Sequence, residues 1–359
     1  MRIAINTGGG DAPGLNAVIR AVVLAALSRG WDTFGIRRGY RGLLTGEGVV
    51  PLGRDEVRGI THLGGTILGT TNRGNPFRWI SEGADGTDTE VDRSDELIAA
   101  FWERGFDGLI AIGGDGSLHI AHRLWQKGLP IVGVPKTIDN DVFGTEQTFG
   151  FDTAVSTATE AIDKLHSTAE SHDRVMVIEL MGRDTGWIAL HSGISATADV
   201  ILIPEIPFDI DKVCDKIRLR ESRGRRFSVV VVAEGAVPKG GTQVLVEDQK
   251  AGSAERLGGI GNQVAEAIAE RTGKETRCLV LGHLQRGGTP TTFDRLLALR
   301  FGAAAVRAVA RGDFGCMVGL TAQSIVHLPL DDVIGQTKRV PLDSDTVCTA
   351  RELGINLGD

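Results

Sequence analysis

Residues 109–141, LIAIGGDGSLHIAHRLWQKGLPIVGVPKTIDND, contain the alternation of apolar and glycine-rich segments that determines the fold. The apolar runs at 109–112 and 131–134 each predict a buried strand, because they are short and rich in isoleucine, leucine and valine. Between them, apolar positions at helical spacing predict a helix that ends at Gly128. These positions are Leu118, Ala121, Leu124 and Trp125. A strand, a glycine turn, a helix and a second strand indicate a parallel α/β sheet.

Two polar segments directly follow these strands, GGDGS at 113–117 and PKTIDND at 135–141. Open α/β sheets bind ligands beyond the carboxyl ends of their strands, so both segments are candidate binding loops. In the first segment, Gly114 and Gly116 leave the backbone bare for a phosphate. In the same segment, Asp115 provides an acid that suits Mg²⁺, and Ser117 provides a hydroxyl at the helix start. The alternative is an N-capped helix that binds nothing.

The second segment places two carboxylates, Asp139 and Asp141, two residues apart in one loop. A kinase that acts on a hydroxyl needs one base near that hydroxyl and one metal-binding acid near the phosphates. For this loop alone, an Asx-turn with solvated acids is the alternative. Beside the glycine segment, the pair is the best catalytic candidate in the chain, and the two loops together suggest phosphoryl transfer.

Three further segments combine glycine with polar residues at predicted strand ends. TGGGDAPG at 7–14 exposes N–H groups and a helix start to a phosphate, or is a tight turn that binds nothing. MGR at 181–183 and GHLQRGG at 282–288 place cations beside glycine, which suits a phosphate, although a single arginine or histidine is usually structural. Tyr40, the only tyrosine, either stacks near a base or phosphate or packs against a turn.

The composition, 42% hydrophobic and 24% charged, is that of an ordinary soluble globular protein. A length of 359 residues suggests two domains, and the net charge of -7 argues against general nucleic-acid binding. The 49 glycines, about twice the usual share of ~7%, imply many tight turns or close approaches. The four cysteines form no CxxC pair, which argues against a zinc site or a disulfide framework. With no apolar run near the ~18 residues of a membrane span and no signal-like N-terminus, we expect a cytoplasmic protein without membrane partners.

Apolar runs recur along the chain and alternate with helical patterns. A strand is predicted at 3–5, followed by a helix that Gly30 ends. Strands that are apolar on both faces and alternate with helices indicate a parallel sheet covered on both sides. We expect 235–259 to be an irregular insertion, with room for short strands such as 244–246. Further strands are predicted at 175–178, 200–203, 229–232 and 279–281.

The order of five segments makes the chain resemble the 6-phosphofructokinase family over almost its whole length, most closely the actinobacterial type. The resemblance implies two Rossmann-like three-layer α/β domains with mostly parallel sheets and the active site between them. It implies a phosphoryl-donor domain of residues 1–138 plus 285–338 and a sugar-phosphate domain of residues 139–284 plus 339–359. The segments are GGDAPGLN at 9–16, GGDGS at 113–117, PKTIDND at 135–141, MGR at 181–183 and GHLQRGG at 282–288.

The resemblance also implies a reaction, the phosphorylation of fructose 6-phosphate at its 1-hydroxyl with Mg²⁺ as cofactor. Asp139 would be the general base, while Asp115 and Asp141 would position Mg²⁺. The transferring phosphoryl group would be bound by Gly10, Thr137 and Arg73. The donor would also contact Tyr40, Gly114, Gly116 and Ser117. The sugar phosphate would contact Thr137, Met181, Gly182, Arg183, Glu234, His283 and Arg286.

Two arginines point to assembly, because Arg174 and Arg277 resemble the pair that reaches the 6-phosphate in a neighbouring subunit. The resemblance therefore implies a homo-oligomer, either a homotetramer or a homodimer.

An effector site is a further expectation from the resemblance. Arg20 and Arg54 match the basic cluster that binds effectors in bacterial members, and the run at 223–226 is similarly basic. Leu24 and His166 stand where arginines are expected. Effector binding would therefore be weak, altered or absent.

Two positions bear on the phosphoryl donor, and they disagree. Gly116 resembles ATP users, because an aspartate at this position would obstruct the α-phosphate of ATP. Lys136 resembles pyrophosphate users, in which this lysine meets the donor, and we count it with the catalytic residues. We give Gly116 more weight, since a lysine can swing away from ATP or pair with its phosphates. ATP is therefore the predicted donor, with pyrophosphate and a reversible reaction as the alternative.

Other functions stay open at this point. A kinase for another sugar phosphate, such as sedoheptulose 7-phosphate, would share these motifs. A nucleotide kinase or a non-catalytic nucleotide sensor would also contain GGDGS. The nucleotide kinase and the sensor are both disfavoured, because the chain also has a base and cations that suit a sugar phosphate. These residues are Asp139, Arg183, His283 and Arg286.

Overall fold

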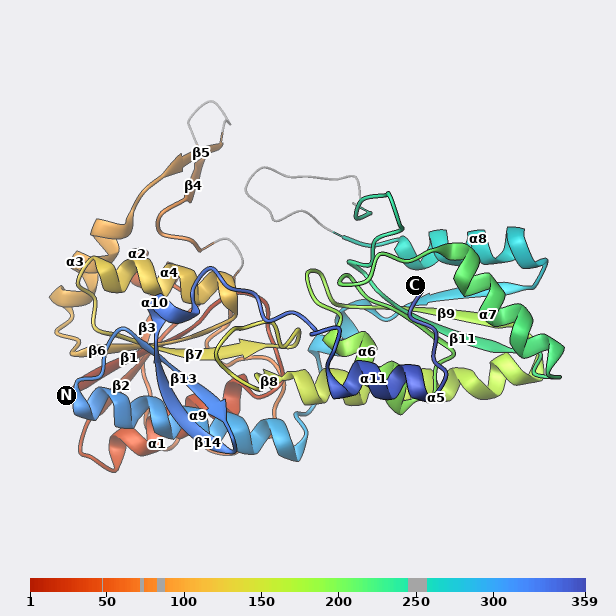
Figure 1. The fold of residues 1–359 in the computed structure, drawn as a ribbon. Coiled ribbons are helices and arrows are strands. Elements are labelled where there is room, and N and C mark those ends of the chain that lie inside the picture. Colours follow the sequence, from red (N-terminus) through yellow and green to blue (C-terminus); the bar gives the residue numbers. More distant parts are fainter. Residues whose placement is uncertain (47, 72–73, 83–87, 245–256) are drawn as a thin grey trace. The chain divides into compact units, whose positions relative to one another are not determined.

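The computed structural model describes residues 1–359 except 47, 72–73, 83–87 and 245–256 (Figure 1). The described residues form two compact units. Unit 1 comprises Met1–Thr153 and Arg286–Thr337. Unit 2 comprises the described parts of Ala154–Gln249 and Ala254–Gln285, together with Lys338–Asp359.

The chain passes between the units after Thr153, after Gln285 and after Thr337. The first of these divisions, after Thr153, lies later in the chain than the boundary at residue 138 that the resemblance implies. The reason is local pairing, since β8 (Phe149–Gly150) pairs with Lys136 and Thr137 of β7 and keeps the intervening loop in unit 1. The assignment of one domain to the donor and the other to the sugar phosphate stays a prediction.

Unit 1 contains an eight-stranded sheet in the order β14-β13-β7-β6-β1-β2-β3, with β8 beside β7. Pairing is parallel from β13 through β2, and the outer strands β14 and β3 pair antiparallel. The strands predicted at 3–5, 109–112 and 131–134 are confirmed as β1, β6 and β7. The bounds are β1 Arg2–Thr7, β2 Asp32–Ile36, β3 Val49–Pro51, β6 Gly108–Gly113, β7 Ile131–Thr137, β13 Cys316–Thr321 and β14 Ser324–Pro329.

Helices cover both faces of this sheet, which gives unit 1 three layers (Figure 1). Alternate residues of one strand enter different cores: Ile110 packs with α1 and α9, whereas Leu109 packs with α3 and α4. This explains why the strands are apolar throughout, as a parallel sheet covered on both sides requires. The helices are α1 Leu15–Leu27, α2 Arg41–Leu44, α3 Ser94–Glu103, α4 Asp115–Gln126, α9 Thr292–Arg311 and α10 Leu330–Val333. A separate hairpin pairs β4 (Trp79–Glu82) with β5 (Asp88–Val91).

Unit 2 contains a four-stranded parallel sheet in the order β10-β11-β9-β12. One face packs against α7 and α8 through buried residues such as Val177, Val230 and Ile268. All four predicted strands are confirmed, as β9 Val175–Leu180, β10 Val200–Leu202, β11 Ser228–Ala233 and β12 Thr276–Val280. The helices are α5 Phe151–Ser171, α6 Trp187–Ser195, α7 Ile210–Ser222, α8 Ile260–Thr272 and α11 Asp345–Glu352, with the 3₁₀ helix η1 at Gly282–Arg286. The predicted short strand at 244–246 lies mostly outside the described residues.

Across the described part of the chain, no helix is both long enough and apolar enough to cross a membrane.

Candidate active site

Three of the predicted binding segments gather at one edge of the unit 1 sheet, two of them rich in glycine and the third, PKTIDND at 135–141, carrying the paired acids. They follow β1, β6 and β7, which are neighbouring parallel strands. A Cβ atom at Gly8 would lie 2.8 Å from Ser117 Oγ, and one at Gly114 would lie 3.2 Å from the Lys136 carbonyl oxygen. Glycine is therefore needed where the segments approach one another, and their backbone remains bare. The juxtaposition of 113–117 with 135–141 was predicted from the sequence, whereas the place of the 7–14 turn beside them follows from the observed strand order.

The helix that follows β6 offers an anion site at its start. It begins at Asp115, and no side chain caps it from Gly114. Free N–H groups at a helix N-terminus attract phosphate, with help from the helix dipole. At Gly116, in this first turn, no atom of the described residues, apart from its chain neighbours and the helix's own backbone, lies within 4 Å of the position that a Cβ would take. There is thus open space beside the residue that the sequence analysis linked to ATP.

Two cations face the turn after β1. The buried Lys136 donates a hydrogen bond from Nζ to the Gly10 carbonyl oxygen. Arg286 Nη1 donates to the Asp11 carbonyl oxygen at 3.3 Å. Burial, followed by the charge of Arg286, lowers the Lys136 pKa to about 8. The candidate phosphate loop therefore has a local positive charge, which an acidic chain needs for an anionic substrate.

The loop after β7 holds its carboxylates in a tight turn. The Asp139 N–H donates to Thr137 Oγ1 at 3.0 Å, and Asn140 has a left-handed backbone with φ of 53°. Burial, followed by the negative charge of Asp139, raises the Asp141 pKa to about 7, and Asp115 adds to this effect. Asp141 Oδ1 is buried and has no hydrogen-bond partner among the described residues.

This arrangement fits a divalent cation. A buried carboxylate oxygen without a donor, close to two other acids, is costly unless a positive charge compensates it. Mg²⁺ binds through one or two carboxylates and retains waters and substrate phosphates, so Asp115 and Asp141 are sufficient protein ligands. Within the described ranges, no three or more histidine, cysteine or acidic side chains are grouped so that they could hold a metal ion. Mg²⁺ does not need such a group of protein ligands.

One predicted donor residue, Tyr40, stands apart from this cluster. Tyr40 is 4% exposed and packs in the core with Leu43 and Phe77, and burial raises its pKa. This favours the packing alternative for Tyr40 over stacking on a ligand. Arg73 lies outside the described residues.

In unit 2, the predicted sugar-phosphate residues follow the carboxyl ends of adjacent strands. Met181, Gly182 and Arg183 follow β9, Glu234 follows β11 and the exposed His283 lies in η1 after β12. The first two segments are hydrogen-bonded, since the Glu234 N–H donates to the Leu180 carbonyl at 2.8 Å and the Gly235 N–H donates to the Gly182 carbonyl at 3.0 Å.

Side chains that no motif indicated also reach these segments. Gln243, Gln285 and Glu205 each hydrogen-bond the backbone between Met181 and Gly186. Gln285 lies within a motif but was given no role, and nothing in the sequence marks the other two. Their contribution depends on contacts between segments far apart in the chain.

Arg174 and Arg277 lie at the other end of this sheet. Arg174 immediately precedes β9, and Arg277 pairs with Met176 near the start of that strand. With a rise of about 3.3 Å per residue, a six-residue strand separates them from the Met181 segment by roughly 15–20 Å. Both arginines contact Glu275, at 2.9 Å and 2.6 Å. Within one chain they therefore cannot meet the same phosphate as Arg183.

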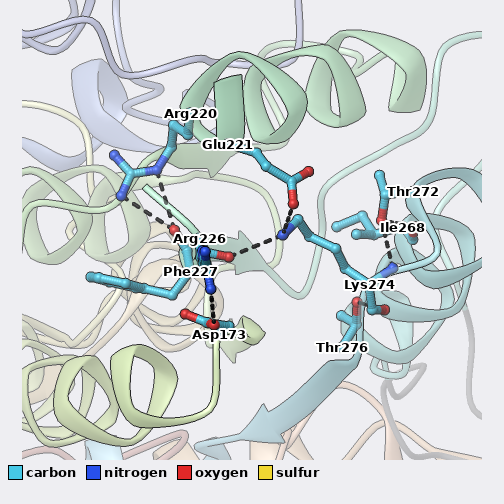
Figure 2. Close-up of polar contacts among 9 residues, drawn as sticks. All are labelled: Asp173, Arg220, Glu221, Arg226, Phe227, Ile268, Thr272, Lys274 and Thr276. Atoms are coloured by element: carbon cyan, nitrogen blue, oxygen red, sulfur yellow. Dashed lines mark hydrogen bonds and ion pairs between the residues drawn. The ribbon is translucent and has the colours of Figure 1, made fainter. Parts of the chain in front are cut away.

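One arginine of the basic run expected at the effector site, Arg226, has an acidic partner within unit 2, and the nearby Lys274 has another (Figure 2). Arg226 lies 3.4 Å from Asp173, and Lys274 Nζ lies 2.8 Å from Glu221. Lys274 also donates to the Arg226 carbonyl oxygen at 3.1 Å. An anionic effector would compete with these carboxylates, and the expectation of weak, altered or absent effector binding stays a prediction.

Comparison with known proteins identifies the family. The sequence model of the phosphofructokinase family matches residues 2–309 of this chain. The chain belongs to the phosphofructokinase family. Among its relatives, the ATP-dependent 6-phosphofructokinase of Chloroflexus aggregans is 52% identical over 358 residues, which cover 100% of this chain and 98% of that protein. The pyrophosphate–fructose 6-phosphate 1-phosphotransferase of Amycolatopsis mediterranei is 52% identical over 346 residues, covering 96% of this chain and 97% of that protein.

Solved phosphofructokinase structures share the fold. The enzyme of Saccharomyces cerevisiae matches 92% of this chain with a TM-score of 0.77 and 34% identity. That of Pichia pastoris matches 99% with a TM-score of 0.79 and 32% identity. This chain spans 45% and 37% of those two longer chains. The predicted α/β class with mostly parallel sheets is confirmed.

Proposed function

We propose that the chain is an ATP-dependent 6-phosphofructokinase, which transfers the γ-phosphoryl group of ATP to the 1-hydroxyl of fructose 6-phosphate. One observation carries the proposal: Asp139 and Asp141 share a tight loop beside a glycine-rich helix start and the buried Lys136. This combines a base, metal-binding acids and a phosphate cradle at one sheet edge. Relatives of nearly the same length that are named for this reaction support it.

Each residue of the unit 1 cluster has a role in this proposal. Asp139 accepts the proton from the sugar hydroxyl as that oxygen attacks the phosphoryl group. Gly10 and Thr137 donate hydrogen bonds to the transferring group, and Lys136 and Arg286 compensate its charge. Positioning and charge compensation carry most of the catalysis of phosphoryl transfer.

Mg²⁺ is the proposed cofactor, held by Asp115 and Asp141, and it would neutralise charge on the donor phosphates. The support is the orphaned Oδ1 of Asp141 and the raised pKa of that carboxyl, which a bound cation would lower again.

The donor assignment rests on Gly116. The open space beside it would accommodate the α-phosphate of ATP, whereas a pyrophosphate user has no need of that space. Lys136 is the observation that favours the second candidate, a reversible pyrophosphate-dependent enzyme. Relatives at 52% identity have either name, so identity alone does not distinguish the donors.

The acceptor is proposed to be fructose 6-phosphate, and its proposed contacts are Thr137, Met181, Gly182, Arg183, Glu234, His283 and Arg286. Cytoplasmic localisation also remains a proposal.

A homo-oligomer completes the proposed site. Arg174 and Arg277 are too far along the sheet from Arg183 to serve the same chain's sugar phosphate, so they are proposed to reach a neighbouring subunit's 6-phosphate. Next to them, the edge strand β12 exposes Leu279 and Val280, at 37% and 50%. An exposed apolar edge of this kind is typical of a protein interface.

The deciding experiment measures initial rates with fructose 6-phosphate and Mg²⁺, offering ATP and pyrophosphate in parallel at equal concentration. Turnover with ATP alone supports the proposal. Turnover with pyrophosphate alone would make Lys136 decisive and the donor assignment wrong. A parallel reaction with sedoheptulose 7-phosphate tests the acceptor, and a higher kcat/KM for that sugar would contradict fructose 6-phosphate as the substrate.

A further inference from the structure

The segment from Met181 to Gly186 lies between β9 and α6 and has neither helical nor strand structure. A segment of this kind must satisfy its peptide groups through other partners. Here the partners include side chains from three distant parts of unit 2. This matters because the segment carries Arg183, a proposed ligand of the sugar phosphate.

The start and end of the segment are each bonded to one side chain. At the start, the fully buried Gln285 accepts from the Met181 N–H at 3.3 Å and donates to the Gly282 carbonyl at 3.1 Å. At the end, the Glu205 carboxylate accepts from the Gly186 N–H at 3.0 Å and from the Val340 N–H at 3.0 Å.

The middle of the segment is held by Gln243. Its Nε2 donates to the Arg183 carbonyl oxygen at 3.0 Å and to the Gly235 carbonyl oxygen at 3.4 Å. One amide group therefore joins the segment with Arg183 to the segment with Glu234. These two segments lie so close that a Cβ at Gly235 would be 1.9 Å from the Arg183 carbonyl oxygen.

Gln243 is itself fixed by its neighbour. Val244 packs against the core between the sheet and helices α7 and α8, and its carbonyl oxygen accepts from the Gly258 N–H at 3.4 Å. The beginning of the expected insertion at 235–259 is thus attached to the core of unit 2. A side chain with such an anchor can hold a neighbouring peptide in one orientation.

We propose that Gln243 is a positioning residue for sugar-phosphate binding, because its amide fixes the Arg183 and Gly235 peptides relative to each other. Rotation of the Arg183 peptide would displace the guanidinium at the end of its long side chain. A displacement of about 1 Å is enough to weaken a bound phosphate's hydrogen bonds. The inference rests on the proposed function of Arg183 and extends it to a residue of the insertion.

The experiment compares Gln243→Ala with wild type and with Gln263→Ala, a matched control in which an exposed glutamine of the same unit is truncated. For Gln243→Ala we expect KM for fructose 6-phosphate to rise about threefold to tenfold, the effect of one lost hydrogen bond. We expect KM for ATP and the melting temperature to match the control. Gln243→Lys keeps an N–H donor and is expected to recover part of the lost affinity.

Three results would overturn the proposal. They are an unchanged KM for fructose 6-phosphate in Gln243→Ala, equal increases in both KM values with a lowered melting temperature, and no recovery in Gln243→Lys. A wild-type protein without turnover on fructose 6-phosphate would instead refute the proposed function. In that case, amide hydrogen exchange at 181–186 still tests the positioning, since exchange no faster in Gln243→Ala than in wild type contradicts it.

Discussion

At the scale of single residues, Asp139 has the most specific role. Replacing it in Asp139→Ser removes the base while the short polar side chain remains compatible with the loop. We expect kcat to fall at least ~10²-fold with little change in KM for ATP, because a positioned base contributes about 10²–10⁴ in rate. Steady-state kinetics with both substrates checks this, and near-normal turnover would remove Asp139 as the base.

Gly116 is the residue that tests donor choice. Among the described residues, no atom outside its own helix backbone and chain neighbours lies within 4 Å of its Cβ position. An aspartate in the first turn of α4 also suits the helix dipole, so Gly116→Asp should fold normally. We expect kcat/KM for ATP to fall by about tenfold or more, as for a carboxylate placed against a phosphate, with little change for fructose 6-phosphate. Unchanged ATP kinetics would show that the steric and electrostatic argument is wrong.

At the scale of elements, α1 and α9 pack closely against each other on one face of the unit 1 sheet. A Cβ at Gly302 of α9 would lie 2.7 Å from both the Ala21 Cβ and the Val18 carbonyl oxygen. Overpacking a buried contact costs about 1–3 kcal/mol or more, so Gly302→Leu should lower the free energy of unfolding by at least this amount. Urea denaturation measures it against Ala310→Leu, an exposed position on the same helix. Equal stability of the two variants would contradict the tight crossing.

The first turns of α5 and α9 are joined by Asp294. It is fully buried, and its Oδ2 accepts from the Thr153 N–H at 2.8 Å and from Thr153 Oγ1 at 2.6 Å. Burial raises its pKa to about 6, above the value of 3.8 for an exposed aspartate. The folded chain therefore holds an extra proton between these two values, and the contribution of this group to stability falls as the pH rises from about 4 to 6.

In Asp294→Asn this pH dependence disappears, because the amide does not titrate. One pKa unit corresponds to about 1.4 kcal/mol, so the free energy of unfolding of the variant minus that of wild type should rise by roughly 2–3 kcal/mol between pH 4 and pH 7. Any destabilisation by the substitution that does not depend on pH leaves this change unaffected. Urea denaturation at both pH values gives this difference. Parallel pH profiles for the two proteins would contradict the raised pKa.

At the scale of the whole molecule, assembly determines whether Arg174 and Arg277 contribute to catalysis. A charge on the exposed β12 edge in Val280→Glu should shift the chain towards monomers and raise KM for fructose 6-phosphate about tenfold, because a neighbour's arginines would be lost. Light scattering after size-exclusion chromatography gives the mass, and Leu353→Glu, another exposed leucine, is the control. An unchanged mass with unchanged KM would exclude β12 as the interface.

The sequence by itself determined the fold class and most of the unit 1 cluster. Period and length identified β1, β6 and β7, and parallel strands necessarily bring their carboxyl ends to one edge. The loops with Gly10, Asp115 and Asp139 were therefore expected at the same edge, and the observed order of β7, β6 and β1 makes them neighbours there. The same local logic identified the segment that carries Arg183, whereas Glu234 was predicted only from the family resemblance.

Only the tertiary structure decided which side chains serve those loops and which do not. Tyr40 is buried in a core that no local pattern reveals, and Arg174 lies a strand's length from Arg183 because β9 runs between them. Gln243 and Glu205 bond to the 181–186 backbone across gaps of many residues. Side chains that act through a neighbour's peptide group need no fixed spacing in sequence, so no pattern indicates them until the chain has folded.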